Sequence, residues 1–271
     1  MLFIIKPFQN ANLDIVLGSL SSAFLAVSAM QSHLPTLWWL AVPISCWTAY
    51  SLDRIKDACH ILSLSQTQSA TLSERHAFHA KHRNCILTLI LFFSLTVPIL
   101  VYLKLPRLYL YFGLVMGFYA GLHIMLSTTH RYKVLKEWHI ATIYTLSVWG
   151  LPIILSPQAI WPTSIYPLFF FLIALLNLTV YSIHDVVYDT HFHLSGLHTI
   201  IGQSGLIKLA LLIPLVCITL FILGLSQGLR PDILTILLLM TFLNGLMLRA
   251  KSYYRYIGEG SFLLPTLLVF L

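Results

Sequence analysis

Apolar runs long enough to cross a lipid bilayer recur from one end of this 271-residue chain to the other. A transmembrane helix needs about 20 mostly apolar residues. Because lipid offers no hydrogen-bond partners to the backbone, each such run is expected to be helical. Nine candidate spans can be counted, at approximately 13–31, 35–52, 85–103, 108–127, 138–155, 163–183, 206–225, 232–249 and 257–271.

The composition excludes an ordinary soluble domain, because 58% of the residues are hydrophobic and only 9% are charged, against about 25% charged in soluble domains. We therefore expect an all-α, multi-pass membrane protein with a single domain over residues 1–271. The net charge of +7 reflects Lys and Arg retained on the cytoplasmic side more simply than nucleic-acid binding, so no nucleic-acid partner is expected. The four cysteines show no paired spacing, which favours neither disulfides nor a zinc site.

The distribution of Lys and Arg predicts the topology. If the N-terminus lies in the cytoplasm, the inner connections hold 13 of the 16 Lys and Arg residues. The positive-inside rule therefore favours a cytoplasmic N-terminus and an external C-terminus. We expect the inner (plasma) membrane of a bacterium, with an organelle membrane as the open alternative.

Two acidic motifs begin with Tyr-Ser and finish with a pair of aspartates, each at the end of an apolar run. The pairs are Asp53 with Asp57 and Asp185 with Asp189, and they make up four of only nine acidic residues. Residues four apart share one face of a helix, where like charges repel. A hard divalent cation such as Mg²⁺, bound by one or two carboxylates plus substrate phosphates, would compensate them. The predicted topology places both pairs at the cytoplasmic face.

Basic residues near these motifs have two interpretations, which both remain open. The basic turn 128–138 could simply anchor the cytoplasmic face, or Lys136, with Arg131 or Lys133, could clamp a phosphate group. Arg54 and Lys56, between the first two aspartates, could neutralise them or contact phosphate.

Three of the 12 histidines recur at helical spacing in a polar helix expected at the membrane surface, over residues 73–83. A transition-metal site at His76, His79 and His82 is conceivable, but no cysteine or carboxylate completes a recognisable zinc pattern. We expect these histidines to be solvated.

Together these motifs resemble the UbiA superfamily of intramembrane prenyltransferases, which have nine helices and two aspartate-rich motifs after the second and sixth. The two aspartate pairs match the final acids of those motifs. In the first motif Ala49 and Tyr50 stand where the family usually has Asn-Asp, and in the second Ser182 replaces an earlier acid. The basic turn resembles the family's Tyr-x-x-Leu-Lys element through Tyr132, Leu135 and Lys136. The segment from Gly196 to Gly202 resembles the one after the second motif.

The resemblance implies a nine-helix UbiA-like bundle that transfers a prenyl group from an isoprenyl diphosphate to an acceptor, an aromatic compound or quinone precursor, within the bilayer. It implies Mg²⁺ at the catalytic and metal-binding residues Asp53, Asp57, Asp185 and Asp189. It further implies that the diphosphate is bound by Lys136, Tyr132, Arg54, Arg131 and Tyr181. A non-catalytic phospholipid-binding relative and a small-solute transporter are the open alternatives, and the oligomeric state is likewise open.

Overall fold

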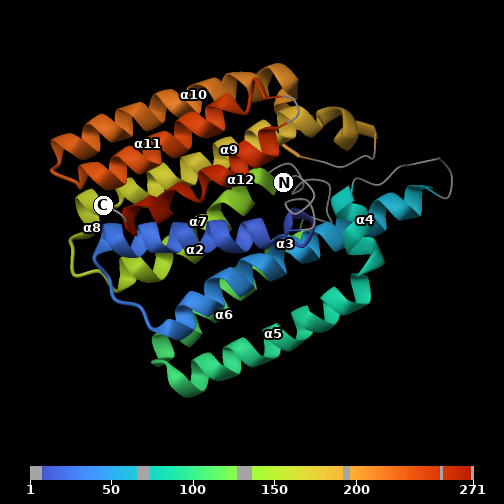
Figure 1. The fold of residues 1–271 in the computed structure, drawn as a ribbon, viewed down its shortest axis with the longest axis horizontal. Helices are drawn as coiled ribbons and strands as arrows, with labels where there is room; N and C mark the ends of the chain where they lie inside the picture. Colours follow the sequence, from blue (N-terminus) through green and yellow to red (C-terminus); the bar gives the residue numbers. More distant parts are fainter. Residues whose placement is uncertain (1–7, 66–73, 127–135, 192–195, 251–252, 270–271) are drawn as a thin grey trace. The chain divides into compact units, whose positions relative to one another are not determined.

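The computed structural model describes residues 8–65, 74–126, 136–191, 196–250 and 253–269, and every regular element within these ranges is helical. This confirms the expected all-α class (Figure 1). The helices are α2 (Leu13–Met30), α3 (Thr36–Ser65), α4 (Glu74–Lys81), α5 (Arg83–Lys104), α6 (Arg107–Leu126), α7 (Lys136–Ile154), α8 (Ile160–Thr163), α9 (Ile165–His191), α10 (His198–Ser226), α11 (Pro231–Leu246), α12 (Tyr254–Ser261) and the 3-10 helix η2 (Leu264–Val269).

Several of these helices have the length and composition of membrane spans, which supports a multi-pass membrane protein. Within the described ranges four helical segments meet both criteria, namely Leu13–Met30, Arg83–Lys104, Ile160–Tyr188 and His198–Ser226. Helices α5 and α10 also expose large apolar side chains, such as Leu91 and Phe92 on α5 and Leu211 and Leu215 on α10, as lipid-facing helices do. The count of nine spans and the cytoplasmic N-terminus stay predictions.

The predicted ninth span, 257–271, differs from the structure. Helix α12 ends at Ser261, and the separate 3-10 helix η2 follows at Leu264–Val269. Pro265 lacks the backbone N–H that a continuous α-helix would use at this point. The apolar composition of this segment was therefore a poor guide to its local structure.

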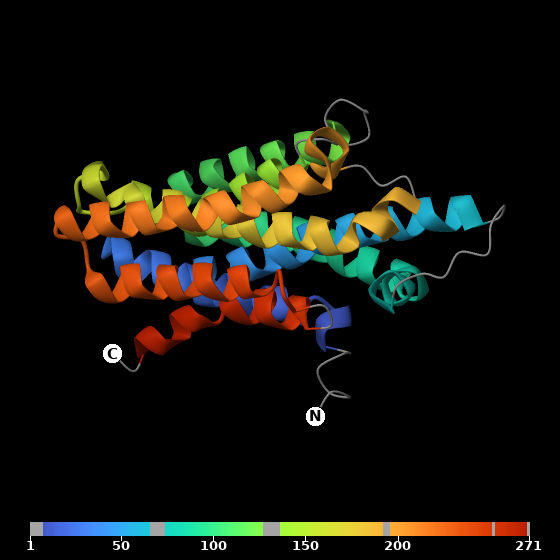
Figure 2. The same ribbon diagram turned by 90° about the horizontal axis from the view of Figure 1, so that it is seen from above.

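The described residues fall into two compact units. Unit 1 comprises residues 1–20 and 35–117, and unit 2 comprises residues 21–34 and 118–271. In unit 1, helices α3, α4 and α5 pack against one another. In unit 2, α9 is the central helix and contacts α7, α8, α10, α11 and α12. Figures 1 and 2 show α9, α10 and α11 running side by side. The expectation of a single domain stays a prediction.

Helix α9 is central because its apolar residues recur every three or four positions. Phe169, Ile173, Leu176 and Val180 are all fully buried, and this spacing places them on one face of a helix. In a bilayer the lipid tails are as apolar as these side chains, so close van der Waals packing holds the helices together. The stacked rings of Trp149 and Tyr166, with centroids 6.2 Å apart, extend this packing to α7.

A buried polar network attaches α12 to α9 and α11. The Asn177 amide of α9 donates to Asn244 Oδ1 of α11 over 2.7 Å, and the Asn244 amide donates to Ser261 Oγ of α12 over 2.8 Å. A Cβ on Gly258 would lie only 2.6 Å from Asn177 Nδ2, so glycine permits the close approach of α12. This attachment fixes the N-terminal turn of α12, where Tyr254 and Arg255 lie, relative to α9.

Helix α10 has a sharp break near its start, at Gly202. The backbone there has φ 64° and ψ 175°, a conformation that is essentially confined to glycine.

We expect Gly202→Ala to lower the free energy of unfolding by roughly 1–3 kcal/mol, measured by thermal unfolding in detergent. Gly245→Ala is the matched control, because a Cβ there would meet nothing within 4 Å and alanine favours a helix. Equal unfolding temperatures for Gly202→Ala and the wild type would contradict this account.

Candidate functional site

Both aspartate pairs lie inside long helices rather than in the connections that follow the predicted spans. Helix α3 continues to Ser65 and α9 continues to His191, so each helix extends beyond the apolar run that was predicted to end near residue 52 or 183. Each pair therefore has the i, i+4 placement on one helical face that the sequence predicted. The polar residues after each apolar run still form helical backbone hydrogen bonds, and hydropathy alone does not detect this.

The first aspartate pair belongs to unit 1 and the second belongs to unit 2. Asp53 and Asp57 are half-buried on α3 in unit 1, with Arg54 half-buried between them. Asp185 is half-buried on α9 in unit 2. Asp189 belongs to the same helix, but its side chain lies outside what is described. That the two pairs converge on one site stays a prediction.

Both carboxylate oxygens of Asp185 already have partners on α12. The Tyr254 hydroxyl donates to Oδ1 over 2.7 Å, and Arg255 Nη2 donates to Oδ2 over 2.5 Å. Burial raises the pKa of Tyr254 and outweighs the opposing effect of Arg255, so Tyr254 keeps the proton that it donates. In this structure, therefore, the counter-charge of Asp185 is a guanidinium group.

Aromatic rings hold Arg255 in position. Its guanidinium carbon lies 5.4 Å from the ring centroid of Tyr181 and 5.3 Å from that of Tyr254, distances at which a cation is attracted to an aromatic ring. Arg255 Nε also donates to the Tyr254 hydroxyl over 2.9 Å. Tyr181, predicted to contact diphosphate, lies one turn before Asp185 on α9, and it contacts Arg255. His184 in turn stacks on Tyr254, with ring centroids 4.3 Å apart.

A buried carboxylate, Glu137 of α7, hydrogen-bonds to the second motif and to the segment that follows it. The Ser182 hydroxyl donates to Glu137 Oε1 over 2.8 Å, and the Leu197 N–H donates to both carboxylate oxygens, at 2.9 and 3.0 Å. A Cβ on Gly196 would lie 2.6 Å from Oε1, which explains the glycine at this position. Where the family resemblance expects an acid, Ser182 thus binds an acid supplied by another helix.

The structure describes only part of the basic turn that was predicted to bind a phosphate group. Lys136 is the first residue of α7 and is half-buried, directly before the buried Glu137. Tyr132, Arg131 and Lys133 lie outside the described residues.

Sequence reasoning missed Glu137, Tyr254 and Arg255 as site residues. Glu137 could have been noticed as one of few acids in an apolar chain, placed beside Lys136. Nothing in the local sequence links residue 255 to residue 185.

In unit 1, α4 carries a buried polar cluster that joins it to α2 and α3. Arg75 Nη2 lies 3.4 Å from Asp14 Oδ2, and both side chains are about 10% exposed. His79 Nδ1 lies 2.9 Å from the Arg75 carbonyl oxygen, while its Nε2 lies 3.1 Å from the Asn12 amide. Asn12 also donates to Ser51 Oγ, 3.2 Å away. The serine of each acidic motif is therefore buried and hydrogen-bonded to a distant segment, Ser51 to Asn12 in the turn before α2 and Ser182 to Glu137 of α7.

The expectation that the three histidines of this segment are solvated was wrong for two of them. His76 is 6% exposed and His79 is 1% exposed, whereas His82 is exposed. They are buried because α4 packs this face onto α3, where partners satisfy the polar atoms of His79.

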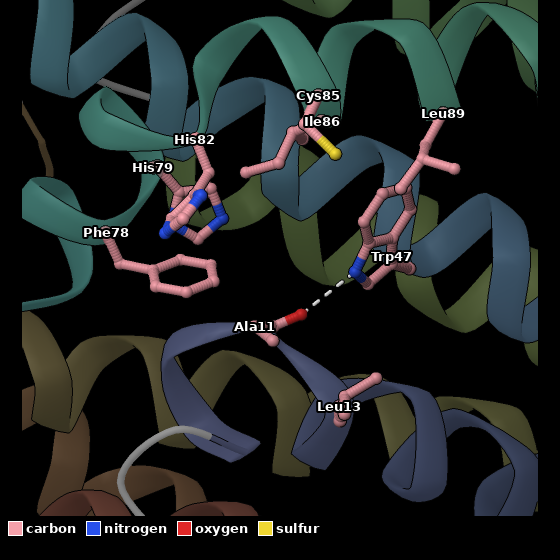
Figure 3. A pocket seen from close by; sticks show the side chains of 9 residues that line it. All are labelled: Ala11, Leu13, Trp47, Phe78, His79, His82, Cys85, Ile86 and Leu89. Carbon is pink, nitrogen blue, oxygen red and sulfur yellow. Dashed lines mark hydrogen bonds between the residues drawn. The ribbon is translucent and has the colours of Figure 1, made fainter.

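A cavity of about 290 Å³ lies next to this cluster (Figure 3). The Trp47 indole on its wall donates to the Ala11 carbonyl oxygen over 2.9 Å, and the His82 ring lies against Phe78 with centroids 4.7 Å apart. The lining is mainly apolar and aromatic with two imidazoles at one end: Ala11, Leu13, Trp47, Phe78, His79, His82, Cys85, Ile86 and Leu89.

The acidic, histidine and cysteine side chains can be compared with the ligands that a metal ion requires. Within the described ranges, no group of three or more His, Cys, Asp or Glu side chains is arranged to hold a metal ion by itself. Mg²⁺ needs less from the protein, because it binds one or two carboxylates and takes water and substrate phosphates as its other ligands. Asp53 and Asp57 offer the type of hard oxygen donor that such an ion prefers; the contacts that they already make would have to be compatible with it. Asp185 fits it only if its contacts with Arg255 and Tyr254 rearrange.

The fold is similar to that of a UbiA homolog from Aeropyrum pernix K1, solved in the apo form. The similarity has a TM-score of 0.61 and covers 94% of this chain and 98% of that chain, at 13% sequence identity. No family model matches the sequence, and no curated protein matches it. The chain therefore has a UbiA-like fold, as the resemblance of its motifs predicted.

Glu137 provides a test of the second motif's anchoring. In Glu137→Gln one acceptor oxygen becomes an NH₂ group, so the Leu197 N–H loses one of its two acceptors and the negative charge that strengthens the remaining hydrogen bonds is removed. We expect a loss of about 1–3 kcal/mol of unfolding free energy, measured by thermal unfolding in detergent. Glu74→Gln, at the exposed start of α4, is the control and should lose less. If the two variants lose the same stability, the role assigned to Glu137 is wrong.

His79 predicts a pH dependence. Burial lowers the pKa of His79 from its ordinary value of 6.5, and the nearby cations of Arg54 and Arg75 lower it further, against the opposing hydrogen bond to the Arg75 carbonyl. Below pH 6.5 the unfolded chain therefore binds a proton that the folded chain does not, so stability falls as the pH falls. We expect unfolding temperatures to drop between pH 7.5 and 5.5, and to drop less in His79→Gln. Replacing the exposed His60 is the control. An unchanged pH slope in His79→Gln would contradict the assignment.

Proposed function

We propose that this protein is a Mg²⁺-dependent prenyltransferase, which transfers an isoprenyl group from an isoprenyl diphosphate to an acceptor within the membrane. The observation that carries the proposal is an i, i+4 aspartate pair on each of two helices, α3 and α9, in a chain with a UbiA-like fold. The apolar helices support it, because a prenyl chain is soluble in the bilayer rather than in water.

The aspartates would hold the metal, namely Asp53 and Asp57 on α3 and Asp185 and Asp189 on α9. When bound, Mg²⁺ would orient the donor's diphosphate and stabilise the negative charge that grows on it as the C–O bond breaks. Lys136 and Arg54 are proposed as further diphosphate contacts, together with Arg131 and Tyr132. Fixed positive charges at the leaving group lower the barrier because they need no reorganisation during the reaction.

The chain's apolar side chains would exclude water from the allylic cation formed when the diphosphate leaves. An electron-rich acceptor, such as an aromatic ring or quinone precursor, would then attack this cation, forming the new bond and losing a ring proton to the released diphosphate or to water. We place the protein in a bacterial inner membrane with its N-terminus in the cytoplasm, because most Lys and Arg residues then lie inside.

One observation favours a second candidate function, a phospholipid- or diphosphate-binding relative without catalysis. Arg255 and Tyr254 bind both carboxylate oxygens of Asp185, so the second motif carries a counter-charge without a metal. Binding without turnover is the outcome that distinguishes this candidate from the enzyme.

The test is diphosphate release from a panel of allylic diphosphates, with purified protein in detergent, Mg²⁺ and candidate aromatic acceptors. We expect release to require Mg²⁺, and Asp53→Asn and Asp185→Asn each to reduce it by about 100-fold or more, because each removes a carboxylate from the charged centre. Asp232→Asn is the matched control. Asp232 lies on α11, outside both motifs, and pairs with Arg230, so the rate of this variant should equal that of the wild type.

Three outcomes separate the candidates. Mg²⁺-dependent release that both motif variants abolish supports the enzyme. Measurable donor binding without turnover, with every acceptor, supports the non-catalytic relative. If no donor binds under any condition, both proposals are wrong.

A further inference from the structure

Arg255 is held at a defined place beside the second acidic motif. Helix α12, which carries it, is attached to α9 and α11 through Asn177, Asn244 and Ser261. The rings of Tyr181 and Tyr254 flank the guanidinium. A guanidinium positioned in this way before any ligand binds loses little conformational freedom when it takes a new partner.

Among the residues that the structure describes, Arg255 uses only part of its hydrogen-bonding capacity. A guanidinium has five N–H donors in a planar fork. Nε donates to Tyr254 and Nη2 donates to Asp185, whereas Nη1 donates no hydrogen bond to any residue that the structure describes. The side chain is 28% exposed, so an anion can reach it. The planar fork suits the oxygens of a phosphate group.

Asp185 cannot satisfy Arg255 and a divalent cation equally well. Arg255 and the cation are both positively charged, and both would bind the same carboxylate. Held side by side at one carboxylate, they would repel each other. If a cation takes Asp185, Arg255 loses its negative partner. The diphosphate of an incoming donor is the anion that arrives together with the cation.

We propose that Arg255 binds the donor's diphosphate, and that Asp185 holds the guanidinium until the donor and its cation arrive. Arg255 thereby becomes a substrate-binding residue, and Tyr254 and Tyr181 position it. This inference rests on the proposed function, because it concerns the donor of that same reaction. The competing explanation is purely structural, with the Arg255–Asp185 pair only fastening α12 to α9.

The experiment measures calorimetric binding of inorganic pyrophosphate in EDTA, where no metal contributes. Arg255→Gln should weaken this binding about tenfold, the value of one charge-assisted hydrogen bond. Asp185→Asn should strengthen it by about three- to tenfold, because the guanidinium no longer has a competing carboxylate. A structural fastening predicts instead that both variants weaken binding or leave it unchanged. The opposite signs therefore distinguish the two explanations.

A second arm uses Mg²⁺ and a non-hydrolysable allylic thiodiphosphate. Here Asp185→Asn should weaken binding, because a proposed cation ligand is lost, so the effect of this variant changes sign between the two arms. Arg255→Lys keeps the charge and loses the fork, and it should fall between wild type and Arg255→Gln. Arg230→Gln, which breaks the pair with Asp232, is the matched control and should match the wild type in both arms.

Several results overturn the inference. One is that Asp185→Asn binds pyrophosphate in EDTA more weakly than the wild type or equally well. This result would overturn the inference even if Arg255→Gln fails to fold. Another is unchanged binding by Arg255→Gln. If the wild type binds the thiodiphosphate with Mg²⁺ but the variants do not change binding in the predicted directions, only the role of Arg255 is wrong. If the wild type binds no allylic thiodiphosphate at all, the proposed function fails together with this inference.

Discussion

A carboxylate in a largely apolar protein needs a positive charge or strong hydrogen-bond donors beside it, and the described parts of this structure depend on meeting that need. Asp14 pairs with Arg75, Asp185 pairs with Arg255, and Glu137 accepts from a serine hydroxyl and a backbone N–H. Each contact joins residues at least 45 positions apart in sequence. Because lipid removes the hydrophobic difference between packed and exposed apolar side chains, such polar contacts and close packing specify which helices meet.

The same contacts explain why short helices matter in this chain. Helix α4 in unit 1 and α12 in unit 2 have eight residues each, fewer than an isolated helix needs in order to be stable. They persist because buried polar networks attach them to longer helices, through Asp14, Asn12 and Ser51 for α4 and through Asn177 and Asn244 for α12. Each short helix then presents polar or charged side chains beside one acidic motif. In both units, a long helix carries the aspartate pair and a short attached helix adds polar or charged side chains beside it.

Local sequence predicted the features that depend on local physics. Runs of apolar residues predicted helices, and the four-residue spacing of the aspartates predicted that each pair shares a helical face. The apolar runs alone did not locate the C-terminal ends of α3 and α9, because hydropathy marks the end of an apolar surface rather than the end of a helix. The burial of His79 and the partners of Asp185 depend on Asn12 and Arg255, which lie 67 and 70 residues away. No periodicity in the sequence encodes those distances, so only the fold shows them.

The pairing of Asp185 with Arg255 also has a consequence for biosynthesis. The two residues are 70 positions apart, and translation at about 5–20 residues per second separates their synthesis by roughly 4–14 s. During that interval α9 already exists while its aspartate has no guanidinium beside it. A bare carboxylate resists entry into hydrocarbon, so we expect the acidic end of α9 to resist burial in lipid until the helix that carries Arg255 is made.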